Sequence, residues 1–533
     1  MLSTTAALGL LLTRPAYLVF PTSLFLTTTT APLSSLRRWA VLVVVGLGLL
    51  IVALDVTILY TALPTLEREL HASTTQGLWI INAYPLVTAG LLLGAGTLGD
   101  RVGHRSLYLL GLLVFAAASF MAAQSLTAEW LILARVLQAV GAAAMMPATL
   151  ALLRLVFLDE RERNVAISVW ASLSLLGAVL GPLLGGWLLE HYAWGSIFLI
   201  NLPVALLAII GALWLAPPQQ PATVLQPWDW RSSLLALVAL SSFVAAIKEM
   251  LASQISLWLM ILLFLVSLGA AILFIRRQTT LSYPLLDFSL FRNAAFSSGV
   301  LAATFVTFAT GALLLSIAQR FQWVAAYTPL QAGLLVSVVF VGTLPSGLIG
   351  GALLHKVGLR SLLSGGLAVA SVGLLLAAFS LDFDITVLVL ALLIAGLGLG
   401  ATISVASTAI IVNAPTHRAG MAASVEEVAY EFGSLFAVAI LGSLLTVLYS
   451  SSLQLPFDAP EAARHGMAEA LMLASQAGAS GGALFAAAAR AFDYAFKMVM
   501  LTAAALLFGG ALLTAYLLRP SRHIITGSVV VSA

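Results

Sequence analysis

Long apolar segments recur along the whole chain, and they restrict its fold more than any other feature. Each runs for about 20 residues or more, the length that an α-helix needs to cross roughly 30 Å of hydrocarbon. Short polar breaks separate one segment from the next. The sequence therefore predicts an all-α polytopic membrane protein with the lipid bilayer as its solvent.

Composition agrees with an embedded chain. Charged residues make up 8% and apolar residues 61% of the 533 positions, and the mean hydropathy is +1.08, outside the range of soluble domains. The formal charge of +3 comes with arginines beside the spans, which membrane topology explains better than nucleic acid binding. The sequence has no cysteine, which excludes a disulfide framework, a thiolate metal site and a cysteine nucleophile.

Fourteen spans are predicted, and basic residues orient them. Placing the N-terminus in the cytoplasm puts most Lys and Arg in inner loops, so we expect a multi-pass protein of the cell membrane, an inner membrane where there are two, with both termini cytoplasmic. The approximate ranges are 39–62, 77–98, 105–124, 128–153, 164–189, 192–215, 231–250, 256–276, 293–318, 329–354, 361–380, 384–412, 421–449 and 494–518.

A repeated segment indicates two related halves. Residues 96–107 align without gaps with residues 351–362, sharing a Val-Gly pair and a final Arg-Ser-Leu. The first copy joins spans two and three, and the second joins spans ten and eleven. The repeat therefore predicts two equivalent six-helix bundles with two helices inserted between them.

This organisation predicts five segments and one long outer loop. Prolines and glycines in that loop predict a helical hairpin; whether it gates the outer mouth stays open, since most long loops are peripheral. The segments are an extension outside the fold at 1–38, the first bundle at 39–217, a linker with the two inserted spans at 218–292, the second bundle at 293–518, which includes the loop 450–493, and a cytoplasmic tail at 519–533.

Four acidic residues lie deep inside predicted spans, away from the span ends, where a charge costs about 2.5 to 3.5 kcal/mol or more. They are Asp55 in the first span and Glu426, Glu427 and Glu431 in the span 421–449. Glu427 and Glu431 share a helix face, whereas Glu426 is rotated by about 100° from Glu427. Arg135 is the one basic residue placed deep in a span, and one arginine cannot neutralise four carboxylates. We therefore predict that these acids hold protons or cations rather than permanent ion pairs.

Such acids offer a coupling chemistry. A buried carboxyl group favours its protonated form, and a bound cation favours the ionised form, so a proton and a cationic substrate compete for it. Aromatic rings near the acids could hold a delocalised cation, although aromatics at helical spacing are more often packing or interfacial residues. The candidate aromatics are Tyr60, Tyr84, Trp170 and Tyr430.

The span 164–189 is rich in small residues, which allow close helix contact and a pliable backbone. This composition suits a hinge between bundles, although glycine pairs also occur in static membrane bundles. The residues concerned are Gly177, Gly181, Pro182, Gly185 and Gly186.

These motifs resemble those of the major facilitator superfamily, in particular its fourteen-helix drug:proton antiporters that export quaternary ammonium compounds and dyes. Residues 177–186 match the antiporter pattern G-x-x-x-G-P-x-x-G-G at every defined position. Residues 424–431 resemble the acid-bearing thirteenth helix of the quaternary ammonium exporters. Residues 54–58 through Pro64 resemble a first-helix motif whose acid is implicated in coupling. The resemblance covers residues 39–518 and implies the major facilitator fold.

Two further segments carry implied roles. Residues 135–141, continuing to Pro147, resemble the motif R-x-x-Q-G-x-G with Ala139 in place of glycine, which implies proton transfer by Arg135. Residues 96–107 resemble the loop signature G-x-L-x-D-R-x-G-R-[KR], with His104 where arginine is usual, which implies a conformational latch. The latch residues would be Gly99, Asp100, Arg101, Gly103 and Arg105.

One departure bears on the substrate. Related exporters of divalent cations can carry another acid in their tenth helix, but the span 329–354 has none and contains Pro345. The resemblance therefore favours monovalent lipophilic cations such as quaternary ammonium compounds, dyes and antiseptics.

Three functional hypotheses follow. The first is a multidrug efflux antiporter, not an enzyme, that works by alternating access as a monomer, needs no cofactor and draws energy from the proton gradient. The second is an exporter of a neutral or anionic antibiotic or metabolite with the same fold. The third is a non-transporting sensor or assembly protein. An ATP-driven pump is disfavoured because the sequence lacks the nucleotide loop G-x-x-x-x-G-K-[ST].

Overall fold

The computed structural model describes residues 34–217, 229–250, 256–281, 284–414, 419–456, 459–477 and 481–519, and every regular element in these ranges is a helix. Thirteen helical segments there are long and apolar enough to cross a membrane. The 29-residue helix α2 (Thr74–Val102) occupies the remaining predicted span. The all-α membrane fold is confirmed.

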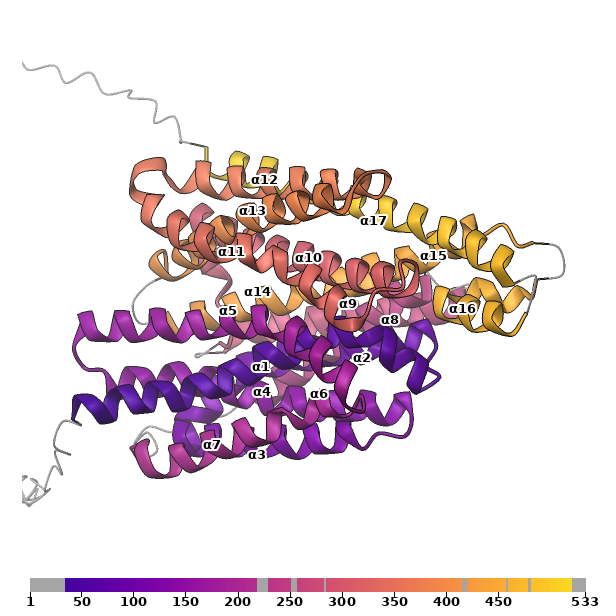
Figure 1. Cartoon of the computed structure of the whole chain (residues 1–533). Helices are drawn as coiled ribbons and strands as arrows, with labels where there is room; N and C mark the ends of the chain where they lie inside the picture. The colour runs from indigo at the N-terminus through magenta and orange to yellow at the C-terminus, as the bar shows by residue number, and fades with distance from the viewer. Residues whose placement is uncertain are drawn as a thin grey trace, which may run out of the picture.

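The helices lie side by side along one direction (Figure 1). The first seven are α1 (Ser35–Glu69), α2 (Thr74–Val102), α3 (His104–Ala123), α4 (Ala128–Val156), α5 (Glu160–His191), α6 (Ser196–Leu199) and α7 (Asn201–Leu215). The others are α8 (Trp230–Met250), α9 (Leu257–Thr280), α10 (Ala294–Trp323), α11 (Pro329–Val357), α12 (Leu359–Phe379), α13 (Ile385–Val412), α14 (Ala419–Phe436), α15 (Ser443–Ser452), α16 (Met467–Gln476) and α17 (Gly481–Leu517).

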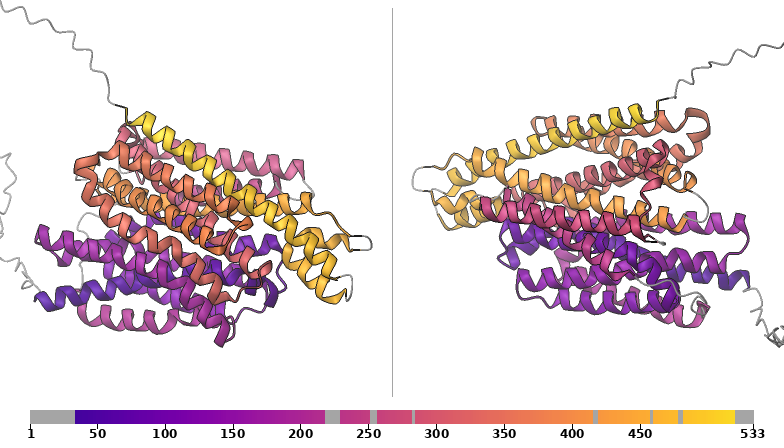
Figure 2. Two further views of the ribbon diagram at one scale, coloured as in Figure 1. Left: turned by 45° about the horizontal axis from the view of Figure 1, so that its top comes forward. Right: turned by 180° about the vertical axis from the view of Figure 1, so that it is seen from behind.

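The helices form two groups and one pair. Helix α3 packs on α4 and α1 packs on α5 and α7, whereas α13 packs between α11 and α12, and α17 packs on α12. Helices α8 and α9 pack on each other, and α8 also contacts α2. Two further views separate the indigo-to-magenta group from the orange-to-yellow group (Figure 2). We refer to α1–α7 as the first half and to α10–α17 as the second half.

The two halves share part of their core near the end of the molecule that holds α16. Leu59, Leu63 and Leu66 of α1 belong to the same buried apolar cluster as Leu313 and Ile317 of α10. The start of α1 and the end of α17 lie at the opposite end (Figure 1). We call these the α16 end and the terminal end.

The repeat has a structural counterpart in two glycine turns. Gly103 ends α2 and precedes α3 with φ +88°, and Gly358 ends α11 and precedes α12 with φ +85°. Glycine adopts this left-handed region without the steric penalty of a Cβ atom. The same residue therefore produces the same turn in each half.

Several elements differ from the predicted spans. The span 192–215 breaks at Ile200 into α6 and α7, and the span 421–449 contains a π-helical turn, Ala437–Gly442, between α14 and α15. Helix α17 starts at Gly481 rather than at 494, because the alanine-rich stretch before the apolar run also favours helix. Helix α1 starts at Ser35, inside the predicted extension, where the Ser34 side chain accepts a hydrogen bond from Arg37 N.

Parts of the predicted organisation lie outside the described residues. These are residues 1–33 of the extension, residues 218–228 of the linker, residues 457–458 and 478–480 of the long loop, and residues 520–533 of the tail. The described part of that loop contains a 3-10 turn, Glu461–His465, and helix α16, which packs on α17.

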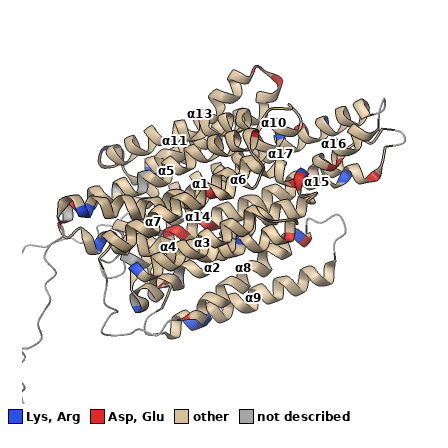
Figure 3. Cartoon of the chain, turned by 60° about the horizontal axis from the view of Figure 1, so that its bottom comes forward, with Lys and Arg blue, Asp and Glu red and all other residues tan. Residues whose placement is uncertain are grey.

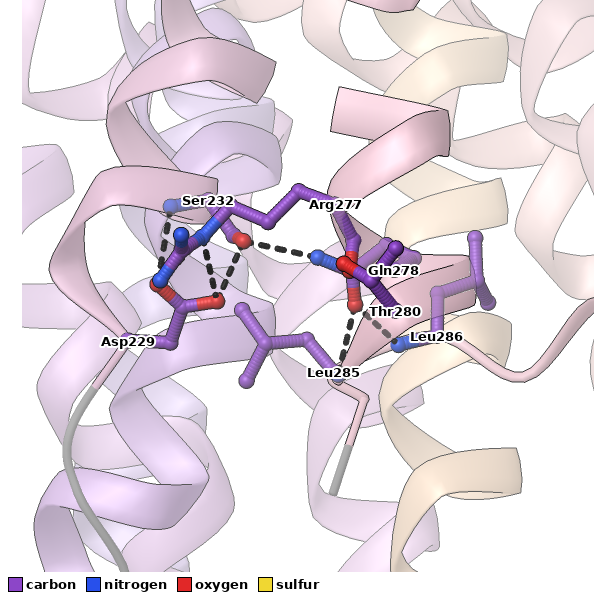
Figure 4. Close-up of polar contacts among 7 residues, drawn as sticks. All are labelled: Asp229, Ser232, Arg277, Gln278, Thr280, Leu285 and Leu286. Atoms are coloured by element: carbon purple, nitrogen blue, oxygen red, sulfur yellow. Dashed lines mark hydrogen bonds and ion pairs between the residues drawn. The ribbon is translucent and has the colours of Figure 1, made fainter. Parts of the chain in front are cut away.

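A polar network fastens the inserted helices α8 and α9 to each other (Figure 4). Asp229 precedes α8, and Arg277 of α9 donates to its carboxylate from Nε at 3.0 Å and Nη2 at 2.8 Å. Gln278 donates to Ser232 Oγ at 2.7 Å and accepts from Leu285 N at 2.7 Å. The network thus ties both helices to the connection that leads into α10.

Candidate functional site

A buried ion pair lies inside the first half. The side chains of Asp55 on α1 and Arg135 on α4 are each 1% exposed, and Arg135 donates a hydrogen bond to Asp55 Oδ2. Gln138 Nε2 and Asn201 Nδ2 donate to Asp55 Oδ1, at 3.0 Å and 2.9 Å. Ser119 Oγ accepts from the same two amides. Both carboxylate oxygens of Asp55 are therefore engaged by donors from α4 and α7.

Local structure explains how these residues meet. Arg135 and Gln138 are three positions apart and share a face of α4, and Arg135 Nη1 donates to Gln138 Oε1 at 2.8 Å. Asn201 is the first residue of α7, which packs on α1, and its side chain is fully buried there. Gln138 is the glutamine of the motif R-x-x-Q-G-x-G, whereas Ser119 and Asn201 were not selected from the sequence. Their polarity within apolar spans was the available signal.

The ion pair corrects one expectation. Asp55 was predicted to lack a permanent basic partner, but Arg135 and Asp55 face each other across α1 and α4. A buried pair of opposite charges with further hydrogen bonds offsets part of the cost of removing both ions from water. In this conformation Asp55 thus has a basic partner, whereas the three glutamates of α14 form no ion pair with a residue that the structure describes.

The glutamates of α14 have different surroundings. Glu426 is buried, accepts a hydrogen bond from the Tyr430 hydroxyl at 2.7 Å and is hydrogen bonded to Ser407 of α13. Glu427 and Glu431 are half-buried, and neither forms a hydrogen bond or an ion pair with another described residue. Two carboxyl groups on one face of α14 are therefore unmatched.

These two carboxyl groups lie close to the ion pair of the first half. Arg135 is near enough to Glu431 for their charges to interact, and the same holds between Glu431 and the hydroxyl groups of Tyr60 and Tyr84. Helix α14 packs on α2 and α10. The acids predicted from the two ends of the sequence therefore meet where the halves face each other.

The candidate aromatics divide into two sets. The Arg135 guanidinium lies over the Tyr84 ring, 4.6 Å from its centroid, in a cation–π arrangement, and Tyr60 and Tyr430 also adjoin the acids. Trp170 instead lies in the apolar core of the first half, and its indole nitrogen has no hydrogen-bond partner among the described residues. Three of the four candidates thus surround the acids.

The glycine-rich face of α5 lies between α1 and α11. A Cβ built on Gly181 would lie 2.0 Å from Thr57 Oγ1 of α1, and one built on Gly186 would lie 2.5 Å from the Leu330 Cα of α11. Such distances admit no side chain, so glycine is what permits the close approach. Gly177 and Gly185 also face α1. Across the halves, the Gly333 Cβ position lies 2.2 Å from the Pro182 carbonyl oxygen.

The predicted latch lies at the terminal end. Gly99 approaches His104, where a Cβ would lie 2.5 Å from Nδ1, and Gly103 makes the turn described above. Arg105 Nη2 donates to the Leu213 carbonyl oxygen at 2.6 Å, and Arg101 is exposed. The Asp100 side chain lies outside the described set, so the latch stays a prediction.

Charges are sparse along the helices (Figure 3), and one buried cation was missed. Lys248, near the end of α8, places its Nζ 4.1 Å from the centroid of the Trp79 ring. That nitrogen is buried and has no hydrogen-bond partner among the described residues. Lys248 was not counted as a deeply placed base because it lies near the end of its span. Its burial comes from the packing of α8 on α2, which the sequence does not show.

Comparisons with known proteins place these features in context. A family model described as Major Facilitator Superfamily matches residues 45–328, and one described as Sugar (and other) transporter matches residues 293–458. The methyl viologen resistance protein SmvA of Salmonella typhimurium is 38% identical over 482 residues, covering 88% of this chain and 96% of the relative. The multidrug efflux pump LfrA of Mycolicibacterium smegmatis is 33% identical over 422 residues, covering 79% and 83%.

A solved structure shares the fold. It is a bacterial homologue of the human lysosomal transporter Spinster, in an inward-facing and unoccupied conformation, with a TM-score of 0.62 and 18% identity. The match covers 91% of this chain and 99% of that one. At this identity the likeness concerns the fold alone.

Proposed function

Because the chain belongs to the major facilitator superfamily, we propose that it is a proton-coupled exporter of lipophilic cations that works by alternating access. Its relatives are resistance proteins and efflux pumps, and it is a membrane transporter of small molecules rather than an enzyme. In this proposal the terminal end faces the cytoplasm and the α16 end faces outward.

One observation supports cation and proton coupling above all others. Glu427 and Glu431 are half-buried acids without a hydrogen bond or ion pair among the described residues, at the interface between the halves. An unmatched carboxylate in an apolar span is costly. Such a carboxylate can bind a proton in one conformational state and face an organic cation in the other. Binding of the cation then releases the proton, and protonation releases the cation.

The other residues support this exchange. Arg135 is held by Asp55 and Gln138 of its own half, so its charge moves with the first half and changes its distance from the acids of α14 when the halves move. The rings of Tyr60 and Tyr84 lie near Glu431, and the Arg135 guanidinium over the Tyr84 ring shows that this ring attracts a delocalised cation. Contacts between α5 and α11, at Gly186 and Gly333, hold the halves together toward the α16 end; they would separate when that end opens.

The proposal is tested by ethidium movement in proteoliposomes under an imposed pH gradient. We expect gradient-dependent transport by the unmodified chain and its loss in Glu427→Gln and Glu431→Gln, because an amide neither ionises nor carries the exchanged proton. Tyr430→Phe is the matched control on the same helix, since it removes only the hydroxyl that serves Glu426. Protein-free vesicles set the background.

The outcomes separate the hypotheses. Ethidium transport that keeps its gradient dependence in both glutamine variants would refute these acids as the coupling site. No ethidium transport by the unmodified chain would shift weight to neutral or anionic substrates, tested next by drug-induced proton release from the purified protein. Absence of both signals would favour a non-transporting role.

Substrate charge needs its own comparison. The absence of an acid in the span 329–354 favours monovalent cations, whereas the relative SmvA is named for resistance to methyl viologen, which is a dication. The same vesicles distinguish the two: we propose that ethidium competes with methyl viologen at Glu427 and Glu431, where two carboxylates could match two charges. If methyl viologen leaves ethidium transport unchanged, the preference is for monovalent cations.

A further inference from the structure

A cavity lies at the α16 end, away from the acids of α14. It has a volume of about 1600 Å³ and is lined by both halves, from the ends of α1, α2 and α5 to α11, α16 and the start of α17. Small-molecule sites usually measure roughly 300 to 1,000 Å³. This cavity therefore has room for an organic cation together with water.

One wall residue has no counterpart to its charge. Glu67 of α1 lines the cavity and is 3% exposed, and both of its carboxylate oxygens lack a hydrogen-bond partner among the described residues. Its Oε1 faces the backbone of α2, where a Cβ built on Gly77 would lie 2.0 Å away. A buried carboxyl group without any partner is costly, so a structural role alone does not account for Glu67.

The other charged groups of the wall leave Glu67 unmatched. Arg464 pairs with Glu461 at 2.9 Å and donates to the Ser450 carbonyl oxygen. Arg68 points to Glu69, with Nε 3.3 Å from Oε1. Glu190 accepts a hydrogen bond from Leu330 N. The wall carries the acids Glu67, Glu190, Glu461 and Glu469 against the arginines Arg68 and Arg464, a balance that favours a cation over an anion.

The same wall carries aromatic rings. Trp323 at the end of α10, Tyr327 in the connection from α10 to α11, and Phe485 of α17 all line the cavity. Trp323 packs edge-to-face on Phe492, and Tyr327 packs on Phe321, so both are held by neighbours. Ring faces attract delocalised cations, and a carboxylate supplies the opposite charge.

We propose that this cavity is a second binding site for the exported organic cation, the last before release, and that the Glu67 carboxylate turns from the α2 backbone into the cavity as its anionic anchor. The proposal rests on the proposed function, since it concerns the same substrate class. On α1, Glu67 lies twelve residues beyond Asp55, about 18 Å along the helix. The cation would therefore pass from the acids of α14 to Glu67 when the contacts between α5 and α11 open.

The chain suits a direct test because it contains no cysteine. A single Thr75→Cys variant places a thiol on an exposed position of the cavity wall. We would measure its labelling by a maleimide in the purified full chain, with tetraphenylphosphonium as the probe cation. We expect the cation to protect the thiol from labelling, because both occupy the same cavity.

The anchor is tested in the same background. Adding Glu67→Gln should raise the tetraphenylphosphonium concentration for half-protection by about tenfold, whereas adding Glu69→Gln should not, since Glu69 is an exposed acid that faces Arg68. Equal protection in the Glu67→Gln and Glu69→Gln variants, or no protection at all, would overturn the proposal.

This readout separates the inference from the proposed function. Protection does not depend on transport, so ethidium transport without Glu67-dependent protection would remove the second site and leave the exporter intact. Glu67-dependent protection without ethidium transport would support the second site and refute export of cations. Thermal unfolding of each variant shows whether it is folded, and Glu67→Asp, which keeps the charge, should restore protection in part.

Discussion

Single residues divide the buried acids of this chain into two classes. Asp55 is engaged by Arg135, Gln138 and Asn201, so it fixes a charge in place. Glu427 and Glu431 have no such donors among the described residues, so each can exchange one partner for another. This difference assigns Asp55 and Arg135 a positioning role and the α14 acids the exchange of proton and cation in the proposed mechanism.

The ion pair yields a graded prediction for stability. Arg135→Gln leaves the Asp55 charge buried without its counterion and should destabilise the fold by about 3 to 5 kcal/mol. Asn201→Ala removes one donor among several to Asp55 and should cost only about 1 kcal/mol. Thermal unfolding in detergent, monitored by tryptophan fluorescence, measures the loss of stability in each of the two variants. Equal loss in both variants would contradict the central place given to Arg135.

At the scale of elements, the inserted helices α8 and α9 are held together by the network around Asp229. Burial acts to raise the pKa of Asp229, but the hydrogen bonds from Arg277 and Ser232 outweigh it and hold that pKa below its usual range. The ionised carboxylate therefore stabilises the fold. Its contribution is present above the pKa of the unfolded chain and is lost as the pH falls through the lower, folded pKa.

Asp229→Asn should consequently weaken the tie between α8 and α9, by about 1.5 to 3 kcal/mol for hydrogen bonds to a charged group. The matched control is Asp384→Asn, because Asp384 caps α13 and its side chain accepts hydrogen bonds from Thr386 of the helix that it caps. Thermal unfolding at neutral and acidic pH compares them. We expect the stability loss caused by Asp229→Asn to become smaller in acid, where the carboxylate of the unmodified chain is also protonated. An equal loss at both pH values would show that the negative charge of Asp229 does not cause it.

For the whole molecule, the two halves contact each other toward the α16 end through α5 and α11. Glu190 of α5 accepts a hydrogen bond from Leu330 N at 3.3 Å, and the Ser337 hydroxyl of α11 donates to the Val179 carbonyl oxygen at 3.3 Å. Gly186 and Gly333 bring the two backbones together. A packed interface of this kind has discrete arrangements rather than a continuum, as alternating access needs.

Fixing that interface should stop transport. A Glu190→Cys and Leu330→Cys pair, bridged by a short reducible thiol reagent, would hold the α16 end closed, and ethidium movement should fall to the vesicle background and return on reduction. The control is a Gln76→Cys and Glu129→Cys pair, which bridges two helices of the first half that share a hydrogen bond. Undiminished transport by the bridged α5–α11 pair would refute motion at this interface.

The sequence by itself determined the helical membrane fold, the spans and the equivalence of Gly103 and Gly358. Apolar length decides whether a helix spans a bilayer, and a left-handed turn selects glycine, so both are local properties. It also singled out the acids of α14, because a charge in an apolar run is conspicuous whatever surrounds it. The break at Ile200 and the early start of α17 escaped it, because a hydropathy pattern does not resolve where one continuous helix bends or extends.

Only the tertiary structure decided which acids have partners. Whether Asp55 meets Arg135 depends on how α1 and α4 face each other, and Asn201 joins them from a helix some 146 positions away in the chain. Glu67 was not among the acids selected from the sequence, and it is the packing of α2 that buries it on the wall of a cavity. Residue type sets what a side chain can do, but burial and neighbours set its energy, and both are properties of the folded chain.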